Sequence, residues 1–141
     1  NVPDEAIQLR ESIPAHVKPT EQWLAFNQRL QQGEATLKTL SEPHFYDPEI
    51  VFFADRLDRY TDSPEFRMIA PDGTTFVTCF SSAELNYATR WILYNGDQQV
   101  AAFVLPATCR PEGFLAAQNS GSLIQLASRE TRHFRVTTGI L

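Results

Sequence analysis

Two short stretches of the chain hold residues whose types and spacing suit chemistry on a polar ligand. In one, Arg110 and Glu112 stand two positions apart in a proline-containing stretch; in the other, His44 and Asp47 precede an apolar run. A carboxylate accepts hydrogen bonds from hydroxyl groups, a guanidinium donates them, and an imidazole exchanges a proton near neutral pH. These groups suit a neutral ligand rich in hydroxyls, such as a sugar.

Aromatic residues near the first stretch fit the same hypothesis. Trp91 or Phe114 can stack on the apolar face of a pyranose ring. Each residue also has a structural explanation, because Arg110 and Glu112 can form a surface ion pair and Asp47 can belong to a turn at a strand entry. The residues alone therefore leave carbohydrate binding as a hypothesis beside a purely structural role.

Several other kinds of site are not expected. The chain contains no glycine-rich phosphate cradle, no CxxC, no HExxH and no GxSxG motif. Its three histidines are far apart, so we expect no metal site and no cofactor. Twelve Lys and Arg residues stand against seventeen Asp and Glu residues, a net charge of −5 without a basic cluster. A nucleic-acid partner is therefore not expected.

The two cysteines, Cys79 and Cys109, are too few for a disulfide scaffold, which predicts a reducing, cytoplasmic compartment. They can bridge if neighbouring strands bring them together, but a small buried apolar role is the simpler interpretation. No apolar run reaches the ~20 residues of a membrane span, so no membrane partner is expected. The chain begins with Asn1 and not Met, as in a processed or truncated product.

A β-hairpin is the clearest predicted element. Two apolar runs, residues 91–94 and 98–105, flank Asn95-Gly96-Asp97, and Asn-Gly supplies the positive φ angles of a tight turn. The following residues, 106–114, contain two prolines and a glycine. They predict a shaped loop that leaves the sheet, and such loops often carry function.

One helix is predicted at residues 20–32, with Thr20 as its N-cap and Gly33 as its stop. In the last predicted strand, Phe134 and Val136 should face inward while His133 and Arg135 face outward. A turn is expected at residues 71–73. Further strands are predicted at residues 7–9 or to Ile13, 50–54, 65–70, 74–80, 123–126 and 131–140.

Many short strands with one helix predict a mainly β fold, an antiparallel β-sandwich. We expect one β-rich domain over residues 1–141, with residues 1–42 as an extended and helical lead-in.

The C-terminal part of the sequence resembles a known family. The motif LPATCRPEGF (105–114), a polar turn and GSLIQLASRETRHFRVTTGI (121–140) are similar to the end of the aldose 1-epimerase, or galactose-mutarotase-like, superfamily. That family shows a strand ending in Glu-Pro, a proline-rich loop, a short strand, a Pro-Gly-Glu turn and a final strand. Residues 128–130 stand in the place of the turn, and residues 46–52 look like the family's acidic segment. The resemblance covers residues 43–141.

The resemblance implies the C-terminal half of a large supersandwich. Open sheet edges then predict a companion, either the missing N-terminal half or a second copy of the chain. The family's catalytic histidines belong to that N-terminal half, and its basic glutamate falls on Leu105, which cannot move a proton. Glu112, seven positions later, becomes the candidate catalytic base. The candidate sugar-binding residues are His44, Asp47, Arg90, Trp91 and Arg110.

Two functions follow as expectations. The first is an aldose 1-epimerase-like enzyme that interconverts the anomers of a sugar at C1, which requires a base and an acid. The second is a non-catalytic carbohydrate-binding or structural β-sandwich of the same ancestry. The leucine at position 105 favours the second, and the intact loop after it favours the first.

Overall fold

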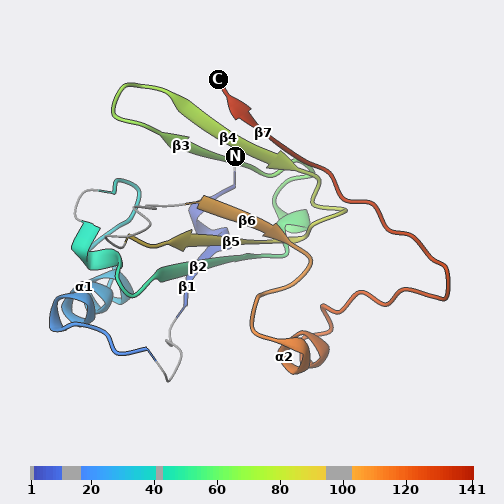
Figure 1. Ribbon diagram of the computed structural model, residues 1–141, viewed down its shortest axis with the longest axis horizontal. Coiled ribbons are helices and arrows are strands. Elements are labelled where there is room, and N and C mark those ends of the chain that lie inside the picture. Colours follow the sequence, from blue (N-terminus) through green and yellow to red (C-terminus); the bar gives the residue numbers. More distant parts are fainter. Residues whose placement is uncertain (1, 11–16, 41–42, 95–102) are drawn as a thin grey trace. The chain divides into compact units, whose positions relative to one another are not determined.

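The protein is mainly β, as the sequence predicts. The computed structural model describes residues 2–10, 17–40, 43–94 and 103–141 (Figure 1). Within these residues the strands form two antiparallel sheets. One sheet has the order β1-β2-β5-β6, formed by Ile7–Leu9, Ile50–Asp55, Tyr87–Ile92 and Phe103–Ala107. The other has the order β3-β4-β7, formed by Glu65–Ile69, Thr75–Phe80 and Val136–Ile140.

The chain divides into two compact units. The first contains Asn1–Ile7, Phe53–Thr89 and Val104–Leu141, and the second contains Gln8–Phe52 and Arg90–Phe103. Each unit has its own apolar core, as expected for segments that must remove their apolar side chains from water.

The core of the first unit joins residues of both sheets. Ala54 of β2 and Ala88 of β5 pack in one cluster with Phe80 of β4. Phe66 of β3 is packed against this cluster, and its ring is stacked on that of Phe80 with the centroids 6.2 Å apart. Side chains from two sheets that share one core are the defining feature of a β-sandwich. The predicted sandwich is consistent with this arrangement.

The core of the second unit is covered by the predicted helix. Helix α1 spans Glu21–Gln31, and Thr20 caps it by accepting a hydrogen bond from the Trp23 backbone N–H at 3.1 Å. Gly33, with φ of 73°, follows the helix end as predicted. Trp23 and Phe26 are buried, and the Trp23 indole N–H donates to the Pro48 carbonyl at 2.7 Å.

The β3–β4 hairpin forms around the predicted turn at residues 71–73. Asp72 accepts a hydrogen bond from the Thr74 backbone N–H at 2.9 Å, and Gly73 adopts a φ of 89°. A side chain at position 73 would be strained at this φ, which explains the glycine.

Strands β5 and β6 are neighbours in the four-stranded sheet, in agreement with the predicted strand pair at residues 90–105. The predicted Asn95-Gly96-Asp97 turn lies outside the described residues, as does Ile13. Strand β6 includes Pro106, so the loop after it begins later than predicted. Pro106 is tolerated because β6 is an end strand of its sheet.

The C-terminal predictions are partly wrong. Residues 123–126 form no strand, and the last strand, β7, is limited to Val136–Ile140. Phe134 and Val136 do not face inward, since 47% and 44% of their surfaces are exposed. Alternation along a strand identifies two faces, but a face is buried only where another layer covers it. A short helix, α2 (Phe114–Asn119), was not expected.

Candidate functional site

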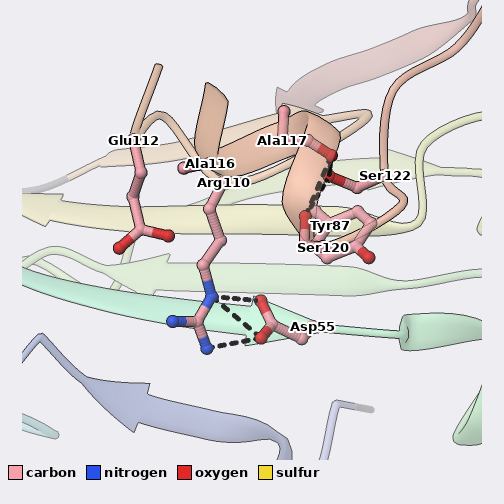
Figure 2. Close-up of a pocket in the computed structure, with 8 residues that line it drawn as sticks. All are labelled: Asp55, Tyr87, Arg110, Glu112, Ala116, Ala117, Ser120 and Ser122. Atoms are coloured by element: carbon pink, nitrogen blue, oxygen red, sulfur yellow. Dashed lines mark hydrogen bonds and ion pairs between the residues drawn. The ribbon is translucent and has the colours of Figure 1, made fainter. Parts of the chain in front are cut away.

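A small polar pocket lies in the first unit, and we call it the Arg110 pocket. Its volume is about 200 Å³, and Figure 2 shows the side chains that line it. The lining residues are Asp55, Tyr87, Arg110, Glu112, Ala116, Ala117, Ser120 and Ser122. Two of the six site residues expected from the sequence are therefore brought together here, with polar neighbours that the sequence did not single out.

Four segments supply the lining. Asp55 is the last residue of β2 and Tyr87 is the first residue of β5. Arg110 and Glu112 come from the loop after β6, and the serines follow from the end of α2. Gly113, with φ of 93°, lets this loop turn directly into α2. The two sheet strands thus form a fixed base on which the loop and α2 place the remaining polar groups.

The ion pair between Arg110 and Asp55 fixes the centre of the pocket. Arg110 Nε lies 2.9 Å from both Asp55 carboxylate oxygens, and its Nη2 also contacts Oδ2 (Figure 2). The guanidinium lies over the Phe53 ring, 4.6 Å from the ring centroid. The hydrogen bond to Asp55 raises the pKa of Arg110, so the group stays charged throughout the usual pH range.

Glu112 has a different environment. Its side chain is exposed, and it forms no hydrogen bond with the residues that the structure describes. Figure 2 shows its carboxylate beside the Arg110 side chain, and its charge contributes to the raised pKa of Arg110. The expected surface ion pair between these two residues is replaced by the pair of Arg110 with Asp55. Glu112 therefore keeps a carboxylate available at the pocket.

The serines complete the polar lining. Ser120 Oγ lies 2.8 Å from Ser122 Oγ and donates to the Ala117 carbonyl at 3.1 Å. Tyr87 contributes a phenol, whose hydroxyl both donates and accepts hydrogen bonds. Carboxylate, guanidinium and hydroxyl groups are thus collected around one cavity.

The other four predicted site residues belong to the second unit. Arg90 donates to the Leu37 carbonyl at 2.6 Å and lies over the Phe52 ring at 5.8 Å, and burial lowers its pKa. These contacts give Arg90 a structural role within its unit. Trp91 follows it in β5 and is half-buried, while Asp47 is exposed. His44 lies in the short turn Pro43–Tyr46, and its side chain is not among those described.

Six of the eight lining residues were missed from the sequence, among them Asp55, Tyr87 and the two serines. Asp55 had a usable signal, because an acidic residue ends an otherwise apolar strand. Tyr87 had none, since its position at the start of β5 depends on pairings between distant parts of the chain. Leu105, at the position where the resemblance places a glutamate, lies in β6 with 43% of its surface exposed.

The cysteines do not form a disulfide, since both Cys79 and Cys109 are free and partly buried. Among the described residues, no group of three His, Cys, Asp or Glu side chains could hold a metal ion. No helix in this part of the chain is long and apolar enough to cross a membrane. Comparison with models of protein families, with curated proteins and with solved structures finds no match to the chain.

Proposed function

We propose that the protein binds a carbohydrate in the Arg110 pocket. The observation that carries the proposal is the fixed Arg110–Asp55 pair beside the available carboxylate of Glu112. Together these groups offer donors and acceptors in fixed directions, which is what recognition of several neighbouring hydroxyl groups requires.

The size and lining of the pocket support a single sugar ring. Its volume of about 200 Å³ lies below the roughly 300 Å³ at which pockets for drug-sized ligands begin. The Tyr87 ring gives an apolar surface beside the polar groups, as a pyranose with one apolar face needs. Ser120 and Ser122 add hydroxyl groups that donate or accept according to the ligand.

Interconversion of anomers is the second candidate function. It needs a base for the anomeric hydroxyl and an acid for the ring oxygen. Glu112 supports the base because its carboxylate lines the pocket and forms no hydrogen bond with the described residues. Tyr87 is the lining residue that can supply the proton, since arginine stays charged. Binding is the stronger proposal, because it needs only the arrangement of polar groups.

A titration followed by two-dimensional NMR tests binding. We expect D-glucose or D-galactose to shift the amide signals of residues 110–122, with little change in the second unit. Arg110→Ala should weaken binding at least tenfold, because it removes the donor at the pocket centre. Glu5→Ala, which changes an exposed charge outside the pocket lining, serves as the control. Shifts that are absent or are spread over the chain would contradict the proposal.

Saturation-transfer NMR on the α and β anomers tests catalysis separately. If the protein accelerates the exchange between the α and β anomers, and Glu112→Gln abolishes this acceleration, the result supports catalysis with Glu112 as the base. Binding without acceleration leaves a carbohydrate-binding protein, and acceleration that Glu112→Gln leaves unchanged excludes Glu112 as the base.

A further inference from the structure

Strand β7 has one edge that no strand among the described residues covers, and we call it the open edge. Strand β7 is the end strand of the sheet β3-β4-β7 (Figure 1), and all five of its residues are exposed to solvent. Its sequence, VTTGI, contains no charge and no proline. Natural sheets usually protect an edge with one of these features. The opposite edge, β3, carries Glu65 and Arg67, so β7 is the less protected of the two.

The hydrogen bonds of β7 show which backbone groups reach this edge. The Leu141 N–H donates to the Thr75 carbonyl at 2.9 Å, so residues 141 and 75 form a hydrogen-bonded pair of the antiparallel ladder. Hydrogen-bonded and non-hydrogen-bonded pairs alternate along such a ladder. Val136, Thr138 and Ile140 therefore direct their N–H and C=O groups away from β4, toward the open edge.

This edge is complementary to itself. If two copies of β7 run antiparallel about a two-fold axis at Thr138, each Val136 lies opposite Ile140 of the second copy, and Thr138 lies opposite its own equivalent. All three pairs have outward-directed backbone groups, so they can exchange about six hydrogen bonds. Pairs of β-branched side chains across neighbouring strands are favourable, and no like charges meet.

Apolar side chains also line up across the two paired β7 strands. Met68, Phe76 and Ile140 form one row across the three strands, and each is at least 41% exposed. In the paired arrangement, Ile140 lies beside Val136 of the second copy, which is itself opposite Phe80 in its own sheet. The exposed row of one copy thus continues into the partly exposed Val136 and the buried Phe80 of the other.

We propose that two copies of the chain associate through β7, forming one continuous sheet of the order β3-β4-β7-β7-β4-β3. This interface does not depend on the Arg110 pocket, which lies on other elements. A closed two-fold pairing uses the whole β7 edge of each copy, so a third copy cannot add through β7.

Hydrogen exchange measured at several protein concentrations tests the register. The amides of Val136, Thr138 and Ile140 should become protected as the concentration rises, because only the second copy supplies their acceptors. The amides of Thr137 and Gly139 face β4 and should be protected at every concentration. Equal protection of all five amides at every concentration would mean that something else occupies the edge, and this would overturn the proposal.

Sedimentation equilibrium with matched proline variants tests the interface. The wild-type chain should approach twice its mass of 16.0 kDa at high concentration. Thr138→Pro removes an outward-directed N–H without affecting the bonds to β4, and it should leave a monomer with unchanged circular dichroism. Ile69→Pro is the matched control, because residue 69 has the equivalent outward position on β3 and should leave the dimer intact. A wild-type monomer throughout, or a dimer lost only in Ile69→Pro, would overturn the proposal.

Discussion

The Arg110 guanidinium and the Asp55 carboxylate, 55 positions apart in the sequence, form an ion pair with Arg110 Nε 2.9 Å from both oxygens. The pair joins the loop after β6 to the end of β2. Because Arg110 also lies over the Phe53 ring, the side chain is held from two sides. The loop that the sequence marks as functional is therefore anchored to the sheet by one of its own candidate residues.

We expect Asp55→Asn to lower the free energy of unfolding by about 1–2 kcal/mol, because it removes the charge opposite a partly buried guanidinium. The two side chains are 26% and 30% exposed, so solvent screening keeps the effect below that of a fully buried pair. Urea denaturation measures this change in the free energy of unfolding. Asp58→Asn is the control, since the Arg56–Asp58 pair is 48% and 41% exposed and its loss should change stability little. Equal effects in the two variants would contradict this account.

The cap of α1 gives a second prediction. Thr20→Ala should cost about 1 kcal/mol of stability, because it leaves the Trp23 backbone N–H without its acceptor. Thr20→Ser keeps the hydroxyl and should stay close to wild type. Thermal denaturation of the three proteins compares them, and an unchanged midpoint in Thr20→Ala would show that the cap contributes nothing.

The sequence predicted the helix ends and the turn that are determined by residues only a few positions apart. Thr20 and Gly33 mark the helix ends, and Asp72 with Gly73 marks the turn between β3 and β4, because each acts on backbone groups within a few residues. The strand at residues 50–54 was visible because both of its faces are largely apolar. For these elements the necessary information lies within the segment itself.

Long-range pairing determines what the sequence did not reveal. The side chains of Phe134 and Val136 are exposed because they lie at or just before an end strand, and alternation does not identify end strands. The partner of Arg110 is Asp55 and not the nearby Glu112, since the loop after β6 reaches the end of β2 only in the folded sheet, where β5 lies between these two strands. Arg90 was a site candidate by type, but its contact with the Leu37 carbonyl makes it structural.

Cys79 provides a test of the β3–β4 register. Burial raises the pKa of its thiol, and the nearby Glu65 carboxylate, 3.7 Å from Sγ, raises it further. Glu65→Gln should lower this pKa and so increase the thiolate fraction at pH 8, which accelerates alkylation. In a Cys109→Ser background, Glu65→Gln should raise the alkylation rate of Cys79 severalfold. In the same background, Glu112→Gln should leave the alkylation rate unchanged. A slower reaction in Glu65→Gln would mean that the two residues are not paired as described.

The turn at Asp72 makes stability depend on pH in a defined direction. Its carboxylate accepts the Thr74 backbone N–H at 2.9 Å, and this hydrogen bond lowers the pKa of Asp72 below its ordinary value of 3.8. Because the folded-state pKa is the lower one, the carboxylate stabilises the fold above pH 3.8. That contribution disappears as the pH falls through the folded-state pKa.

Asp72→Asn separates the charge from the hydrogen bond, because its amide oxygen can still accept from Thr74. Wild type should be the more stable protein at pH 6, and the difference should vanish once the pH is low enough to protonate the carboxyl in both the folded and the unfolded chain. Urea denaturation at several pH values gives the difference, and titration of the Asp72 carboxyl carbon by NMR gives the midpoint. A midpoint at or above 3.8, or a difference that grows toward low pH, would show that the ionised carboxylate does not hold this turn.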